Sequence, residues 1–171
     1  QAMVERLGPM SSYVDRKGGA RPWNRWCFIN ANTHNKLSIS LNIHRPRGME
    51  SFKRLVKVSD VVYENSFPAT MERLGVTYEM LREVKEDIIY LRAPAMGTWG
   101  PYRGYRLHGA SLEAFVGLTT LRGYRDVHYS TNSSTFVGDF AAGAQGAFAV
   151  LAALHHRART GEGQLIEVSQ G

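Results

Sequence analysis

Short apolar runs alternate with amphipathic segments along the first part of the sequence. Residues 37–43 alternate apolar with polar side chains, whereas residues 61–63 and 88–91 are continuous apolar runs. Alternation and short runs rich in β-branched and aromatic residues are typical of strands. We therefore predict a half-buried strand at 37–43 and two further strands at 61–63 and 88–91. The strand at 61–63 ends at Glu64 and Asn65.

Amphipathic segments between these runs predict helices. One helix follows Pro46, a second begins at Pro68 and ends at Gly75, and a third has Thr77 as its N-cap. Strands that alternate with helices at short spacing favour a parallel sheet covered by helices, which is an α/β fold. Ligands of such sheets lie beyond the carboxyl ends of the strands. We therefore expect a site near residues 64–67 and 95–102.

The second half of the chain is predicted to be mainly helical. The predicted elements are a helix at 108–121, a polar loop at 123–134, a helix at 140–159 and a strand at 165–168. The apolar stretch 140–154 is too short to cross a bilayer, so we interpret it as a buried helix.

Asp139 lies just before this long helix, among glycine and alanine and with no basic residue close in sequence. Aspartate is a preferred N-cap, so one interpretation is an ordinary helix cap. The other is a carboxylate nucleophile or acid/base. The small residues at 141–143 and 146 leave room for a ligand or for a closely packed helix, and both interpretations stay open at this point.

Histidines offer a second candidate for chemistry. His108 precedes a predicted helix, where it is either a structural or surface histidine or a proton carrier that acts with Asp139 on an α-proton. His155 and His156 lie at the end of the long helix, where a positive charge favours the helix dipole. No third ligand stands at suitable spacing, so we predict no metal site.

Composition narrows the class of protein. The chain has 171 residues, 43% of them hydrophobic, and one cysteine, Cys27. This composition supports a folded core, excludes a disulfide framework and fits a reducing, cytoplasmic location. The net charge of +6 comes from scattered basic residues without a Lys/Arg block. Such residues are either solvated surface charges or contacts to a partner that carries phosphates, which could be a nucleic acid or a small ligand such as a nucleotide or coenzyme A. Charge alone does not choose between these, and a non-catalytic basic α/β binding module is one alternative.

Five segments occur in a fixed order along the chain: Asn35-Lys-Leu-Ser38, Ser59-Asp-Val-Val-Tyr-Glu-Asn65 with Met71-Glu-Arg-Leu-Gly75, Gly97-Thr-Trp-Gly-Pro-Tyr102, Gly138-Asp-Phe140 and Thr160-Gly-Glu-Gly-Gln164. Together they resemble the family III CoA-transferases, which include formyl-CoA and carnitine CoA-transferases and the related α-methylacyl-CoA racemases. The resemblance covers about residues 22–169 and implies a Rossmann-like large domain.

The resemblance also implies an activity. Asp139 corresponds to the catalytic aspartate of the transferases, which attacks an acyl-CoA thioester and passes CoA to a second carboxylic acid through an aspartyl anhydride and an aspartyl-CoA thioester. Acyl-CoA and a carboxylic acid would be the substrates, without a metal and with neither a nucleic-acid nor a membrane partner. The implied contacts to CoA are Asn65, Arg73, Gly97, Gly100 and Tyr102.

Some features depart from the family. Its Glu-Asn-Phe-Arg-Pro-Gly segment stands here as Glu64-Asn-Ser-Phe-Pro-Ala69, so the contacts expected at 66, 67 and 69 are not carried over. We interpret residues 1–30 as an irregular segment and 31–171 as a partial large domain, without the family's first strand and second domain. Family members form interlocked homodimers, so we expect a homodimer when the protein is full length and no activity from this piece alone.

The racemase subgroup is the alternative. Its members pair a Gly-His-Asp histidine with an aspartate in a Gly-Asp-Phe setting. Asp139 and Phe140 fit that setting, and His108 lies at the matching place upstream, but Leu107 and Gly109 replace its neighbours. We therefore favour a CoA-transferase and keep His108 as the partner of Asp139 for the racemase.

Overall fold

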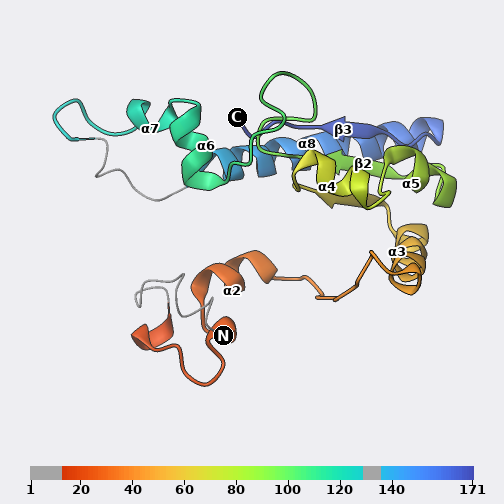
Figure 1. Ribbon diagram of the computed structural model, residues 1–171, viewed down its shortest axis with the longest axis horizontal. Coiled ribbons are helices and arrows are strands. Elements are labelled where there is room, and N and C mark those ends of the chain that lie inside the picture. The colour runs from red at the N-terminus through yellow and green to blue at the C-terminus, as the bar shows by residue number, and fades with distance from the viewer. Residues whose placement is uncertain (1–12, 129–135) are drawn as a thin grey trace. The chain divides into compact units, whose positions relative to one another are not determined.

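A computed structural model describes residues 13–128 and 136–171 (Figure 1). The chain divides into two compact units, Gln1–Ser40 and Leu41–Gly171. In the described part of the first unit, two 3-10 helices, Val14–Arg16 and Pro22–Asn24, precede helix α2, Cys27–Thr33. An antiparallel bridge joins Tyr13 to Trp26. The first unit therefore contains a short helix in addition to irregular chain.

The second unit is built on a parallel sheet of order β1-β2-β3. Its strands are β1, Val61–Glu64, β2, Ile89–Arg92, and β3, Leu165–Glu167. In register, Val61 pairs with Ile89 and Tyr90 pairs with Leu165. The central strand is buried on both faces, which explains its continuous apolar sequence. The predicted α/β fold with a parallel sheet is confirmed.

Helix α3 (Pro46–Val58) precedes β1. Helices α4 (Pro68–Arg73) and α5 (Tyr78–Val84) connect β1 to β2. Helix α4 begins at Pro68 as predicted, because proline suits the first turn of a helix. Helix α3 begins earlier than predicted, since it includes Pro46 and Gly48, which were expected to precede it. The Thr77 hydroxyl accepts a hydrogen bond from the Met80 amide at 3.3 Å, as a helix cap should. The core that these helices cover consists of Val56, Val76, Leu81, Ile88 and Tyr90.

Beyond β2 the chain forms α6, Gly109–Phe115, and α7, Leu118–Leu121. A single helix was expected at 108–121, but Gly117 has a φ of 82° and interrupts it. The long helix α8, Val137–Thr160, then packs against β2. A Cβ added to Gly146 would lie 3.0 Å from Leu91, so the small residue is what allows this close approach.

Two expectations from the sequence are wrong. Helix α8 is not a buried helix, because only Ala142, Gly146 and Ala153 on it are buried. By length and composition alone, with a mean hydropathy of 1.4, it is also long enough to cross a bilayer. The strand predicted at 37–43 is not formed, and Leu37 and Ile39 are 102% and 64% exposed. A strand needs a neighbour for its backbone hydrogen bonds, and none of the described strands pairs with this segment.

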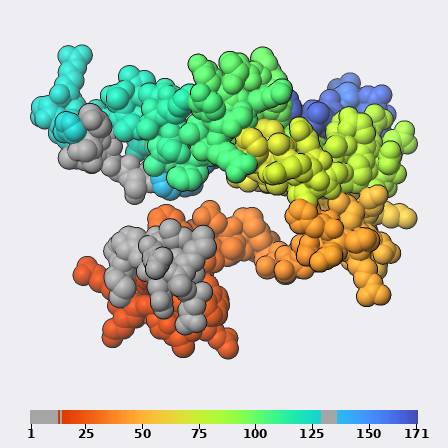
Figure 2. Space-filling view, viewed as in Figure 1, coloured from red at the N-terminus to blue at the C-terminus, as the bar shows by residue number. Residues whose placement is uncertain are grey.

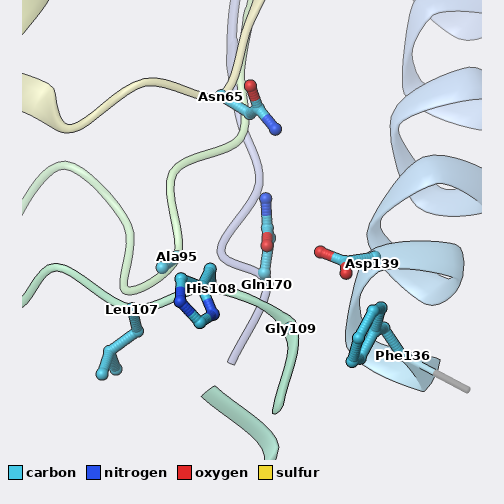
Figure 3. A pocket seen from close by; sticks show the side chains of 8 residues that line it. All are labelled: Asn65, Ala95, Leu107, His108, Gly109, Phe136, Asp139 and Gln170. Atoms are coloured by element: carbon cyan, nitrogen blue, oxygen red, sulfur yellow. The ribbon is translucent and has the colours of Figure 1, made fainter. Parts of the chain in front are cut away.

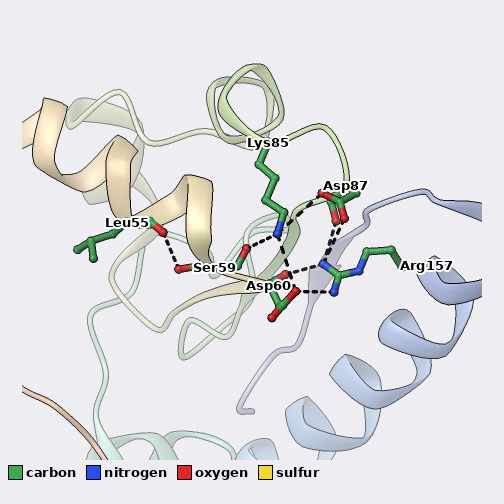
Figure 4. Close-up of polar contacts among 6 residues, drawn as sticks. All are labelled: Leu55, Ser59, Asp60, Lys85, Asp87 and Arg157. Atoms are coloured by element: carbon green, nitrogen blue, oxygen red, sulfur yellow. Dashed lines mark hydrogen bonds and ion pairs between the residues drawn. The ribbon is translucent and has the colours of Figure 1, made fainter.

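A polar cluster fixes the C-terminal half of α8 to the sheet at the end opposite the strand carboxyl ends (Figure 4). Arg157 donates from Nη2 to the Asp60 carboxylate at 2.7 Å and from Nη1 to the carbonyls of Asp60 and Asp87 at 3.2 and 3.3 Å. Lys85 Nζ donates to the Ser59 carbonyl at 2.7 Å. The three bonds of Arg157 hold α8 alongside the sheet, so that the other end of this helix lies near the strand carboxyl ends.

Candidate active site

A cavity of about 340 Å³ lies beyond the carboxyl ends of the strands (Figure 3). The loops after β1, β2 and β3 each contribute to it, as expected for a parallel sheet. Its lining residues are Asn65, Ala95, Leu107, His108, Gly109, Phe136, Asp139 and Gln170. The structure thus brings three residues predicted from the sequence, Asn65, His108 and Asp139, to a single cavity.

Asp139 occupies the first turn of α8, and the N-cap of that helix is Phe136. The aspartate is therefore not the N-cap, which removes the ordinary cap interpretation. Its side chain points into the cavity toward Gln170 (Figure 3). Among the residues described, no hydrogen bond or ion pair reaches its carboxylate. Asp139 is thus a carboxylate with both oxygens available to a ligand.

The surroundings of Asp139 make its carboxylate more basic. Burial raises its pKa above the usual value, and the negative charge of Glu113 adds to this shift, whereas His108 acts in the opposite direction. A carboxylate that is poorly stabilised by its surroundings is a better nucleophile than one held in an ion pair.

His108 is the N-cap of α6. Its backbone amide donates to the Ser111 hydroxyl at 3.0 Å, so the turn that carries the histidine is closed by a hydrogen bond of its own. The ring lies in the same cavity as Asp139 (Figure 3). This arrangement agrees with the relation between the two residues that a racemase would need.

A buried ion pair fixes the turn that carries Asn65. Glu64 is 7% exposed and accepts hydrogen bonds from the Ser66 amide at 2.6 Å and from Arg92 Nε at 3.0 Å. Arg92 also donates to the Pro68 carbonyl at 3.4 Å. Because both charges are paired, the turn is held firmly while the Asn65 side chain remains exposed.

A second cavity, of about 220 Å³, adjoins the first and shares Asn65, Ala95 and Leu107 with it. Arginines from two segments line it: Arg73 from α4, and Arg103 and Arg106 from the loop after β2. Figure 2 shows this loop, in green, directly beside α4, in yellow. Three guanidinium groups around one cavity are suited to bind phosphate groups.

The glycine-bearing loop, residues 97–102, lies beside these cavities, and none of its residues lines either of them. Gly97 and Gly100 have φ values of 75° and 91°, a backbone conformation that favours glycine. Tyr102 packs its ring 5.4 Å from the ring of Phe115 on α6. The predicted contacts of Gly97, Gly100 and Tyr102 with CoA stay predictions, and the structure gives these residues a role in shaping the loop.

Sequence reasoning missed several residues of the site. Arg103 and Arg106 follow the glycine-bearing loop at a spacing of three and could have been noticed as a basic pair. Gln170, whose Nε2 donates to the Ala93 carbonyl at 2.7 Å, carries no local signal. Within residues 13–128 and 136–171, no group of three or more side chains is placed to hold a metal ion.

The sequence matches CoA-transferase family III over residues 11–171. The succinyl-CoA–L-malate CoA-transferase beta subunit of Chloroflexus aurantiacus is 36% identical over 137 residues, which cover 80% of this chain and 34% of that protein. Formyl-CoA:oxalate CoA-transferase of Streptomyces avermitilis is 32% identical over 135 residues, which cover 79% of this chain and 32% of that protein. This chain therefore spans about a third of the length of the relatives it matches.

Solved structures share the fold. A CaiB/BaiF family protein of Brucella suis superposes with a TM-score of 0.72 at 30% identity and covers 79% of this chain and 35% of its own. A hypothetical protein of Mycobacterium tuberculosis gives a TM-score of 0.70 at 31% identity, with 79% of this chain and 38% of that one covered. With the family match, the shared fold and the order of the motifs in agreement, the chain belongs to CoA-transferase family III.

Proposed function

We propose that the intact protein transfers CoA from an acyl-CoA to a second carboxylic acid, with Asp139 as the nucleophile. The observation that carries this proposal is the position of Asp139, unpaired among the described residues, in a cavity that adjoins a pocket with three arginines. The transferase activities of the relatives from Chloroflexus and Streptomyces support it. Since this chain matches about a third of those relatives, the proposal concerns the intact protein.

The proposed reaction proceeds through two covalent states of Asp139. A carboxylate oxygen attacks the thioester carbonyl of the donor, the C–S bond breaks, and CoA leaves as the thiolate, so that a mixed anhydride remains. The thiolate then attacks the aspartyl carbonyl, which forms an aspartyl-CoA thioester and releases the donor acid. The acceptor carboxylate then attacks the aspartyl-CoA thioester, which releases CoA thiolate and forms a second mixed anhydride. The thiolate attacks the acceptor carbonyl of this anhydride, which gives the new acyl-CoA and regenerates Asp139. Together, these steps replace one difficult transfer with several easier ones.

The pocket with three arginines is the proposed site for the phosphates of CoA. Arg73, Arg103 and Arg106 supply positive charge, and the Arg106 guanidinium is held 4.7 Å from the centre of the Phe67 ring. Asn65 lines both cavities and lies where the thiol arm would pass from the phosphates to Asp139. A phosphate site of this kind would use three of the arginines that are dispersed along this basic chain.

The direct test is to trap the covalent state. The intact protein is incubated with an acyl-CoA, treated with hydroxylamine, and digested for mass spectrometry. We expect a hydroxamate on the peptide that contains Asp139, and loss of both the label and transfer in Asp139→Ala. Asp126→Asn, an exposed aspartate outside the two cavities, is the matched control and should behave as wild type. Transfer by Asp139→Ala would refute the mechanism.

The second candidate is an α-methylacyl-CoA racemase, which is favoured by the presence of His108 and Asp139 in one cavity. A racemase would remove the α-proton of the acyl group and return it on the other face. Incubation in deuterated water distinguishes the two reactions. Deuterium at the α-carbon without transfer to an added acid, abolished in His108→Ala, would select the racemase.

We also propose that the intact protein is a cytoplasmic homodimer and that the 171-residue chain alone does not catalyse transfer. The family resemblance supports the homodimer, and the small share of the relatives that this chain covers, about a third, supports the lack of transfer by this chain alone. Light scattering of the intact protein should give twice the mass of one chain. A single-chain mass in a fully active sample would exclude the dimer.

A further inference from the structure

The first turn of α8 carries Asp139 and receives its hydrogen-bond acceptor from another helix. The N-cap residue of α8 is Phe136, whose side chain offers no acceptor. A helix begins with amide groups that have no acceptor within the helix, and these groups need partners from outside. Helix α6 lies against this end of α8 (Figure 1) and carries Glu113, which is only 5% exposed.

The two carboxylate oxygens of Glu113 have separate partners. Oε1 accepts a hydrogen bond from the Val137 amide, the first residue of α8. Oε2 accepts from Arg122 Nη1 at 2.6 Å, and the Arg122 side chain is itself 18% exposed. The buried negative charge is therefore compensated by Arg122 while one oxygen is kept for the helix. Asp139 stands two residues beyond the amide that Glu113 binds.

Tight packing between the two segments keeps this contact in place. A Cβ added to Gly109 on α6 would lie 2.8 Å from the Phe136 ring, and one added to Gly138 would lie 3.6 Å from Leu112. Leu112, next to Glu113 in sequence, is 1% exposed. The first turn of α8 therefore lies in close contact with α6, and its direction is set by this packing.

We propose that Glu113 is a positioning residue for the nucleophile: it caps α8 from α6, with Arg122 as its counter-ion, and so fixes the turn that presents Asp139. The inference rests on the proposed function, because it assigns Glu113 a role only if Asp139 is the reacting group. Glu113 is not among the residues that line the cavity.

The same contact places a negative charge near Asp139. Asp139 interacts electrostatically with Glu113 on α6, with His108 at the N-cap of α6 and with Tyr63 on β1. Arg122 is bound to Glu113. Removal of the Glu113 charge takes away one of the two causes that raise the pKa of Asp139. The nucleophilic form would then persist to lower pH.

Two variants of the intact protein separate position from charge. Glu113→Ala removes the acceptor for the Val137 amide, so we expect the rate of hydroxamate formation at Asp139 to fall by about tenfold or more, with KM for acyl-CoA little changed. Glu113→Gln keeps an oxygen for that amide, so its rate should stay closer to wild type. Its acidic limb in a pH–rate profile should move to lower pH, which loss of structure alone would not cause. Glu83→Gln, on the exposed side of α5, is the control.

Hydrogen exchange on the same variants gives a readout without catalysis. Glu113→Ala should speed exchange of the amides in the first turn of α8, whereas Glu83→Gln should not. Wild-type exchange, trapping rate and pH profile in both Glu113 variants would overturn the inference. Absence of any label on Asp139 in the wild-type protein would instead contradict the proposed function, and the exchange experiment would still show whether Glu113 caps α8.

Discussion

At the scale of single residues, the carboxylates near the site differ in how they are satisfied. Glu64 and Glu113 are buried and each has an arginine and a backbone amide as partners. Asp139 lies in the first turn of α8, which Glu113 binds, and in the described part of the chain its carboxylate has no such partner. The glutamates therefore have structural roles, and Asp139 is the carboxylate left available for chemistry.

Arg106 provides a prediction for substrate binding. Arg106→Gln removes one of three positive charges from the proposed phosphate pocket, so KM for acyl-CoA should rise about tenfold, as expected for loss of a charge-assisted hydrogen bond, with kcat little changed. Steady-state kinetics at two salt concentrations measures both values. Arg54→Gln, exposed on α3, is the control, and an unchanged KM in Arg106→Gln would move the phosphate site elsewhere.

Gly109 provides a prediction for stability. A methyl group at this position would lie 2.8 Å from the Phe136 ring, too close without a shift of the α8 N-cap. Gly109→Ala should therefore lower the free energy of unfolding by about 1–3 kcal/mol, the usual range for overpacking, and should slow trapping at Asp139. Gly104→Ala is the matched control, because a Cβ there meets no atom within 4 Å. Equal urea denaturation midpoints for the two variants would contradict the prediction.

At the scale of elements, the polar cluster of Arg157, Asp60, Asp87, Lys85 and Ser59 determines how α8 is attached to the sheet. The hydrogen bond and charge of Arg157, with the charge of Lys85, hold the pKa of Asp60 below its usual value. A carboxyl group with a lowered pKa stabilises the fold above its unfolded pKa, and this contribution is lost as pH falls through the folded pKa. Asp60→Asn should therefore lower Tm at pH 7, and its difference from wild type should shrink as the solution is acidified below about pH 4.

Arg157→Met tests the same attachment at constant pH. The substitution leaves the carbonyls of Asp60 and Asp87 without this donor, so we expect a loss of about 1–3 kcal/mol in the free energy of unfolding. Glu86→Gln, an exposed residue of the neighbouring turn, should stay within about 0.5 kcal/mol of wild type. If thermal unfolding shows no difference between these variants, the cluster does not stabilise α8.

Elements with local signals were predicted well from the sequence. Pro68 of α4, the Thr77 cap of α5 and the apolar run of β2 each act within a few residues, and the structure shows those elements where they were expected. The carboxyl ends of a parallel sheet must share one edge, so the general place of the cavity also followed from the sequence.

Features that depend on distant partners were not predictable. Residues 37–43 have the alternation of a strand, but alternation says nothing about whether a neighbouring strand exists. The contact between Glu113 and Val137 joins residues 24 apart in sequence, and Gln170 reaches Ala93 across 77. Contacts of this kind arise only from packing, which explains why the sequence pointed to Asp139 and not to the residues that pack around its helix.

At the scale of the whole molecule, α8 has two different sides. Small residues on one side pack against β2, whereas Phe140, Phe148 and Leu151 on the other are 69%, 75% and 66% exposed. Their spacing places these three side chains along one face of the helix. A continuous apolar face of this kind is unusual on the surface of an isolated soluble protein. Since the chain matches about a third of its relatives, we expect this face to be covered in the intact protein.

Phe148→Lys should therefore act in opposite directions in two preparations. In the isolated 171-residue chain, a lysine on the exposed face should reduce self-association, as measured by light scattering. In the intact protein, the same lysine would enter a covered region and forfeit the burial of the ring, which should lower the free energy of unfolding by about 1.5–3 kcal/mol. Glu86→Lys, at an exposed polar position, should leave the stability of the intact protein within about 0.5 kcal/mol of wild type. An intact Phe148→Lys protein as stable as wild type would mean that this face of α8 stays open to solvent, and that other surfaces join the copies of the proposed homodimer.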